Sequence, residues 1–200
     1  NRIKREQKIT VVIGNPPYKE KAEGRGGWLE KGSSQPGSKD IQAPMDRWRP
    51  PVEWGVGAHA KHLKNLYVYF WRWTLWRLFE QQTCGGIVTF ITASSFLGGP
   101  AFVGMREHMR REFDEIYVIN LGGDLLGTRK TPNVFNIQTP VAITIGVRSG
   151  ERDTEKAANV RYVRVEADSR AAKLLALDAL DKVDTLPWEA VSDGWLDPFY

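Results

Sequence analysis

Four consecutive residues, Asn15, Pro16, Pro17 and Tyr18, have the types and the spacing needed to hold an amino group. The Asn15 side chain offers an oxygen that accepts hydrogen bonds, and Pro16 offers a backbone carbonyl beside a rigid ring that has no N–H. Two neighbouring acceptors suit a donor with two hydrogens, which is an –NH2 group. The Tyr18 ring adds a face on which a planar base can stack. Taken alone, Asn-Pro-Pro is also a turn sequence, so the surrounding elements have to decide between a turn and a site.

The segment before this loop predicts a strand that carries it to a ligand-binding edge. Residues 9–13 (ITVVI) are a β-branched apolar run that stops at Gly14, which is typical of a buried strand in a parallel sheet. The two prolines cannot continue the hydrogen-bond ladder, so the strand has to end there. Because ligands of open parallel sheets bind beyond the carboxyl ends of the strands, the loop lies where a site is expected.

The rest of the chain alternates apolar runs with helical patterns. Helices are predicted at residues 61–82 and 101–112, and further strands at residues 87–92, 115–121 and 141–147. No helix separates the last two strands, so strand 141–147 is expected to run antiparallel. The helix at 61–82 is apolar nearly all round, which predicts burial on more than one side. The sequence therefore predicts an α/β fold with a partial Rossmann-like sheet, mainly parallel, whose last strand is antiparallel.

Two segments fall outside this alternation. Residues 19–58 are rich in Gly, Pro, Ser, Trp and charged residues and show no periodicity, which predicts a flexible insertion. From residue 150 the composition changes, and a predicted strand at 159–165 and helix at 169–180 precede a stretch without a clear period. We therefore expect a boundary between residues 149 and 150.

Composition excludes several kinds of protein. Hydrophobic residues make up 42% of the 200, enough to build a core. The single cysteine, Cys84, excludes an internal disulfide framework and fits a cytoplasmic location. We find no signal peptide and no apolar run long enough to cross a membrane. His59, His62 and His108 have no partners at metal-ligand spacing, so no metal site is expected.

Charge is unevenly distributed along the chain. Residues 1–150 carry 21 Lys or Arg against 13 Asp or Glu, whereas residues 151–200 carry 7 against 11. A basic body suggests an anionic partner, with nucleic acid the leading candidate. The alternative is that a modest excess of basic residues only keeps the surface soluble.

Placed after an apolar strand, Asn15-Pro16-Pro17-Tyr18 resembles the catalytic motif of amino-group methyltransferases that use S-adenosylmethionine. The resemblance implies that Asn15 and the Pro16 carbonyl draw the amino nitrogen of adenine toward tetrahedral geometry, so that it attacks the sulfonium methyl in line. No general base has to act first. An adenine in a duplex would have to be flipped out of its stack to reach the loop.

Several further segments resemble type I single-polypeptide (type ISP) restriction-modification enzymes, in which a helicase precedes an N6-adenine methyltransferase and a target-recognition domain. The resemblance runs from about residue 9 to about residue 180 and is weak in residues 19–58. Its segments are NLYVYF (65–70), GGIVTFIT (85–92), SFL (95–97), Met105-Arg106, Phe113, IYVINLGG (116–123), NVF (133–135) and PVAIT (140–144).

This resemblance assigns roles to parts of the chain. Residues 1–149 correspond to the C-terminal half of the methyltransferase domain, and residues 150–200 to a linker and the start of a target-recognition or accessory domain. Phe135 is implied to stack on the flipped base opposite Tyr18; the alternative is a core residue on a loop. The two loops meet at one edge of the sheet only if strand 141–147 is antiparallel.

The cofactor-binding part of such enzymes lies before the Asn-Pro-Pro-Tyr loop. Only 14 residues precede Asn15, so we expect the chain to lack most of the S-adenosylmethionine pocket and to be a piece of a longer polypeptide that supplies it, with or without a helicase. The expected activity is methylation of the exocyclic amino group of adenine in double-stranded DNA, within a bacterial restriction-modification or phage-defence protein. Two alternatives stay open: a truncated, non-catalytic DNA-binding fragment, and an amino methyltransferase that acts on RNA or on protein glutamine.

Overall fold

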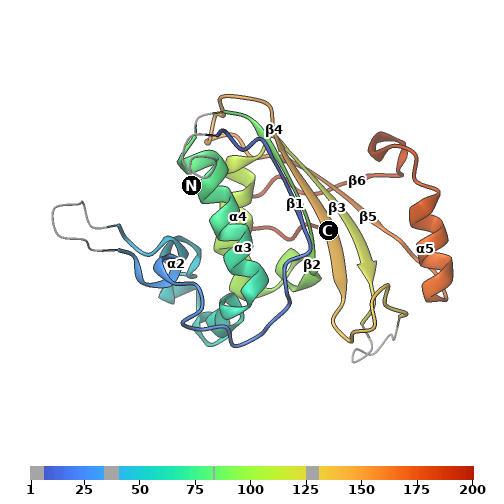
Figure 1. Cartoon of the computed structure of the whole chain (residues 1–200), viewed down its shortest axis with the longest axis horizontal. Helices are drawn as coiled ribbons and strands as arrows, with labels where there is room; N and C mark the ends of the chain where they lie inside the picture. Colours follow the sequence, from blue (N-terminus) through green and yellow to red (C-terminus); the bar gives the residue numbers. More distant parts are fainter. Residues whose placement is uncertain (1–6, 34–40, 83, 125–130) are drawn as a thin grey trace.

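The computed structural model describes residues 7–33, 41–82, 84–124 and 131–200, and its centre is a mixed sheet of six strands in the order β1-β2-β4-β3-β5-β6 (Figure 1). The strands are β1 (Val11–Gly14), β2 (Gly86–Ala93), β3 (Glu115–Gly122), β4 (Val141–Arg148), β5 (Asn159–Arg164) and β6 (Glu189–Ala190). β1 is parallel to β2, and β3 to β5, whereas β4 is antiparallel to both of its neighbours and β6 to β5. The mixed α/β fold is therefore confirmed.

The predicted antiparallel strand is confirmed as β4, but it lies inside the sheet. β4 pairs with β2 on one side and with β3 on the other. The described part of the connection between β3 and β4 contains no helix, and β4 runs back antiparallel to β3 and lies between two strands that are parallel to each other. The sheet then continues past it through β5 and β6.

The prediction that the first strand is buried is wrong, although its parallel pairing is confirmed. The side chains of Val11 and Ile13 are 51% and 77% exposed. β1 is an edge strand that pairs with β2 alone among the described residues. Strands of parallel sheets are normally covered on both faces, so an apolar edge strand with one open face is an unusual feature of this chain.

The helical layer is built mainly by α3 (Leu66–Leu75) and α4 (Val103–Glu112), which cover one face of the sheet (Figure 1). Helix α5 (Arg170–Asp178) lies beside β5, with Ser169 capping its first turn. The remaining short helices are α2 (Trp28–Lys31), a π-helical turn at Trp76–Glu80, and 3-10 turns at Pro44–Trp48, Val52–Trp54, Gly57–Lys64, Ser94–Leu97, Pro100–Phe102 and Val183–Thr185.

The single helix predicted at residues 61–82 is three successive elements. A 3-10 helix ends at Lys64, Asn65 adopts an extended conformation, and its side chain caps α3 by accepting a hydrogen bond from the Tyr67 amide (3.4 Å). The prediction of burial on more than one side is confirmed for most of α3, where Tyr67 and Tyr69 lie on different sides and are both buried, but one face is open. Tyr67 and Trp71 are fully buried, whereas Phe70 and Trp73 are 42% and 39% exposed.

The predicted flexible insertion, residues 19–58, has more local structure than its composition indicates. In its described parts, Leu29, Met45 and Trp48 are buried in the main core, and the Trp48 indole donates to His108 Nδ1 (2.9 Å). Residues 34–40 lie outside the described part of the chain. The flexibility of the insertion stays a prediction.

The sheet shows no break at residue 150. β5 pairs with β3, and near the end of the chain Phe199 is fully buried in the main core while its amide donates to the Leu97 carbonyl (2.8 Å). The Arg106 guanidinium donates to the carbonyls of Leu196 (3.2 Å) and Asp197 (3.1 Å), which fixes the end of the chain against residues 103–112. The assignment of residues 150–200 to a further domain stays a prediction.

Candidate active site

The Asn15–Tyr18 loop leaves the carboxyl end of β1, as predicted. Asn15 and Pro17 are exposed, Pro16 is buried and Tyr18 is half-buried. The strand can end tightly against β2 because residue 14 is glycine: a Cβ there would lie 3.1 Å from the Phe90 ring. The loop therefore starts from a backbone position that is fixed by close packing.

Tyr18 holds the Asn15 side chain in one orientation. The Tyr18 hydroxyl lies 2.7 Å from Asn15 Oδ1 and 3.1 Å from the Ile91 carbonyl, and both are acceptors. Partial burial raises the pKa of Tyr18 to about 12, so the phenol is protonated and donates at neutral pH. The Asn15 oxygen faces Tyr18 and keeps a second lone pair for another donor.

Tyr18 and Phe135 come from different loops but pack against the same group of side chains. Both contact a small buried cluster that lines the sheet face opposite α3, made up of Ile119, Leu121, Val134, Val141 and Val163. The antiparallel β4 makes this possible, because its first residue, Val141, pairs with the last residue of β2, Ala93. The two loops therefore lie at one edge of the sheet, which is the condition that a two-sided base pocket requires. Stacking of both rings on a base stays a prediction.

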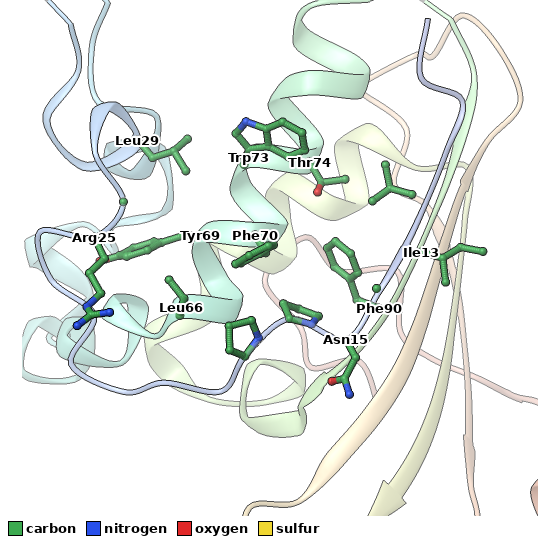
Figure 2. Close-up of a pocket in the computed structure, with 15 residues that line it drawn as sticks. Ile13, Asn15, Arg25, Leu29, Leu66, Tyr69, Phe70, Trp73, Thr74 and Phe90 are labelled. Atoms are coloured by element: carbon green, nitrogen blue, oxygen red, sulfur yellow. The ribbon is translucent and has the colours of Figure 1, made fainter. Parts of the chain in front are cut away.

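An open apolar pocket of about 530 Å³ lies beside the loop, between β1, α3 and α2 (Figure 2). Its walls include Leu66, Phe70 and Trp73 of α3, and Asn15 lies at its edge with the amide pointing away from these rings. Thr74 also lines it; its hydroxyl is buried and has no hydrogen-bond partner within the described part of the chain. Because this hydroxyl is buried, the surface that the pocket offers to a ligand is mainly apolar.

A second, more polar pocket of about 780 Å³ lies on the Tyr18 side of the same loop. Tyr67 and Ser95 form its polar wall, with their hydroxyl oxygens 3.1 Å apart. Lys21 and Lys61 also line it. The loop thus separates two hollows, with Asn15 lining the apolar pocket and Tyr18 lining the polar one.

The lining residues of α3 are the part of the site that sequence reasoning missed. Phe70 and Trp73 were expected to be packed in the core, yet they line the open pocket. Their spacing with Leu66, which puts them on one face of α3, was the available signal. An apolar face looks the same in a sequence whether the protein core or a ligand covers it.

The histidines have structural surroundings. His108 is fully buried between the Trp48 indole and Glu112 (Nε2 to Oε1, 3.3 Å), and burial lowers its pKa. The rings of His59 and His62 stack 6.3 Å apart. Within the ranges that the structure describes, no group of three or more His, Cys, Asp or Glu could hold a metal ion, and no helix is long and apolar enough to cross a membrane.

Solved structures share this fold. The type ISP restriction-modification enzyme LlaBIII bound to DNA matches 96% of the chain with a TM-score of 0.72 and 24% identity. A nuclease-deletion mutant of the type ISP enzyme LlaGI, in complex with a DNA substrate mimic, matches 98% with a TM-score of 0.71 and 23% identity. A DrdV–DNA complex matches 96% with a TM-score of 0.65 and 23% identity.

The match covers a small part of each of these proteins. The chain spans 13% of the LlaBIII chain, 18% of the DrdV chain and 19% of the LlaGI chain. No family model and no curated protein matches the sequence. At this level of identity the likeness establishes the fold, and any activity has to be argued from the site.

Proposed function

We propose that this chain carries the catalytic loop of an S-adenosylmethionine-dependent methyltransferase that acts on the exocyclic amino group of adenine in double-stranded DNA, within a restriction-modification protein. The observation that carries the proposal is the Asn15 oxygen, which Tyr18 holds in place at the exposed carboxyl end of β1. The solved structures support it, because two are type ISP restriction-modification enzymes and all three contain DNA or a DNA mimic.

The chain's own residues would act by position and by hydrogen bonding. Asn15 Oδ1 and the Pro16 carbonyl would accept the two hydrogens of the amino group and favour the tetrahedral nitrogen of the transition state. The Tyr18 hydroxyl would hold the Asn15 side chain so that its oxygen, and not its NH2 group, is placed to accept from the amino group. Tyr18 and Phe135 would hold an extruded adenine between their rings.

The apolar pocket fits one part of the cofactor. When bound, S-adenosylmethionine supplies a methyl group activated on a sulfonium, next to an adenosine with a flat apolar face and polar edges. Phe70 and Leu66 would contact that face. The pocket is open, so these residues form one wall and other groups have to complete it.

The upstream part of the same polypeptide is the proposed partner that completes the wall. β1 has one unpaired edge within the described chain, and apolar side chains beside it are exposed on the face opposite α3 (Val11, Ile13 and Ile87) as well as on the pocket side (Phe70 and Trp73). A parallel strand at this edge, with layers over both faces, would bury all of them.

Calorimetry with S-adenosylmethionine tests this division of the cofactor site. The 200-residue chain should bind weakly or not at all, whereas the complete polypeptide should bind. Micromolar affinity of the chain alone would show that the cofactor site is not divided as proposed.

Substitution of Asn15 tests the catalytic proposal in the complete polypeptide. Asn15→Ala should lower the single-turnover rate of methyl transfer by about 100- to 1,000-fold with little change in DNA affinity, because it removes an acceptor used at the reacting group. Asn159→Ala is the matched control, since this exposed amide bonds to Glu115 at the opposite end of the sheet (2.9 Å). A near-normal rate for Asn15→Ala would contradict the proposed role.

The open pocket favours a second candidate for the chain taken alone, which is DNA binding without methylation. The same assay separates the two when it is run on the chain alone as well as on the complete polypeptide. Transfer of label by the complete polypeptide supports the enzyme, whereas DNA binding without transfer in the presence of the cofactor supports the binding module.

A further inference from the structure

The loop that carries Phe135 is held at its base by a buried asparagine. Asn133 is 6% exposed, and its side-chain amide donates to the carbonyls of Gly123 (3.0 Å) and Thr139 (2.8 Å). Its oxygen accepts from the Phe135 amide (2.9 Å). One side chain therefore bonds to both ends of the loop and to the backbone of the residue proposed to stack.

Two basic side chains of helix α5 also donate hydrogen bonds to this loop and its base. Lys173 is 2% exposed; its ammonium group donates to the Pro132 carbonyl (2.7 Å) and to the Leu121 carbonyl. Arg170, one turn earlier on the same face of α5, donates from Nε to the Val134 carbonyl (2.8 Å). The two cations bond to the carbonyls of the residues on either side of Asn133.

These bonds order the loop before a ligand binds, which matters because ordering it costs entropy. The connection between β3 and β4 is long, and fixing its backbone costs conformational entropy for every residue. A ring on a mobile loop would have to be ordered when the base arrives, which weakens binding. A buried lysine is also costly unless its charge is well bonded, so Lys173 has to keep both carbonyls in place.

We propose that Arg170 and Lys173 of α5, acting with Asn133, are positioning residues that fix Phe135 for stacking on the extruded base. This inference rests on the proposed function, because it assigns Phe135 to the base pocket. It places residues of the C-terminal segment in control of one wall of the active site. A change in α5 would therefore alter base capture without touching the base.

Arg170 provides the sharper test because it is exposed, so its replacement should leave the fold intact. The complete polypeptide is titrated with a duplex that carries 2-aminopurine at the target adenine, and affinity and emission are both recorded. Phe135→Ala should weaken binding roughly 5- to 150-fold. Arg170→Ala should weaken it about 2- to 10-fold and shift the emission of the complex in the same direction as Phe135→Ala. Lys182→Ala, an exposed lysine beyond the end of α5, is the control and should change neither quantity.

The double variant separates positioning from direct contact with DNA. If Arg170 acts through Phe135, Arg170→Ala should have no further effect in the Phe135→Ala background. An equal effect in both backgrounds would show that Arg170 contacts DNA itself and would overturn the inference. No effect of Arg170→Ala while Phe135→Ala has one would also overturn it, and the proposed function would stand.

Lys173→Met supplies an independent arm. Methionine keeps most of the volume of the side chain but cannot donate to the two carbonyls. Thermal unfolding is measured first, and in a folded variant the emission should shift as it does for Arg170→Ala. A folded Lys173→Met with unchanged emission would overturn the role of Lys173. If Phe135→Ala itself has no effect, the base pocket of the proposed function fails, and the inference fails with it.

Discussion

The two sides of the Asn15–Tyr18 loop differ in how completely the chain builds them. On the Phe135 side, Asn133, Arg170 and Lys173 bond to the loop backbone, and a buried cluster supports both aromatic rings. On the apolar side, Phe70 and Trp73 are partly exposed, β1 has an unpaired edge within the described chain, and the Thr74 hydroxyl has no partner there.

This difference indicates which of the two proposed binding sites the chain builds by itself. A side chain that is fixed by bonds within the chain is ready for a ligand, because little ordering remains to be done on binding. An apolar wall without an opposite wall excludes no water and holds a small molecule weakly. The comparison predicts a base-binding side that is complete and a cofactor side that depends on further residues.

The largest expected effect comes from placing a charge on the open side. In the complete polypeptide, Ile13→Asp should lower the free energy of unfolding by several kcal/mol, because a carboxylate would be buried where the proposed partner covers β1. Val52→Asp is the matched control: Val52 is 90% exposed and is not among the residues of β1 or of the apolar pocket, so we expect a change of about 0.5 kcal/mol or less. Equal effects of the two changes, measured by denaturant unfolding, would show that nothing covers β1 in the complete polypeptide.

A smaller effect is expected from removing either ring of the proposed base pocket. Tyr18→Ala and Phe135→Ala should each weaken capture of 2-aminopurine at the target position by about 1–3 kcal/mol. The double variant should lose more than either single one, but less than their sum, since the base can tilt onto the remaining ring. If Phe135→Ala changes neither emission nor affinity while Tyr18→Ala changes both, Phe135 is only a core residue.

Removing the Tyr18 hydroxyl alone should have a still smaller effect. Tyr18→Phe keeps the stacking ring but loses the donor that orients Asn15, so we expect methyl transfer to slow by about 10-fold or less while base capture is unchanged. Single-turnover kinetics beside 2-aminopurine emission measure the two quantities separately. A loss of base capture with a normal rate would reverse the roles of ring and hydroxyl.

The smallest effect concerns His108 of α4, which accepts a hydrogen bond from Trp48 of the insertion at residues 19–58. Burial lowers the pKa of His108, so the folded chain keeps it neutral while an unfolded histidine gains a proton near pH 6.5. The unfolded state then binds more protons, and stability should fall as the pH drops below about 6.5. The pKa of Glu112 is lowered, despite burial, by its bond to His108 and by nearby cations. The stability that this carboxylate contributes is therefore lost only at more acidic pH. His108→Gln should flatten the slope of melting temperature between pH 7 and pH 5; an unchanged slope would remove His108 as its source.

Most of the strands could be predicted from the sequence because their patterns are self-contained. The runs in β2, β3 and β4 are long and rich in β-branched residues, and their predicted and observed limits agree within about one residue. The antiparallel direction of β4 followed from the missing helix alone. The position of Asn15 and Tyr18 at a strand end followed from the two prolines.

What could not be predicted depends on neighbours that are distant in sequence. The exposure of Ile13 and Trp73 depends on whether anything covers β1 and α3, and the residues themselves do not record it. The break before α3 was readable, since Asn65 stands before an apolar run as a helix cap does, but the run of apolar residues on both sides obscured it. The bonds from α5 to the Phe135 loop join residues 36 and 41 positions apart that carry no local signal.

The identity of the methylated atom tests the central claim most directly. The complete polypeptide is incubated with S-adenosylmethionine labelled on its methyl group and a duplex that contains its target sequence. The DNA is then digested to nucleosides, which are separated and counted. We predict that the label is recovered as N6-methyldeoxyadenosine and that Asn15→Ala slows its formation by about 100- to 1,000-fold. Label in cytosine, in RNA supplied as a competitor or in protein, or no label in DNA that is demonstrably bound, would contradict the account.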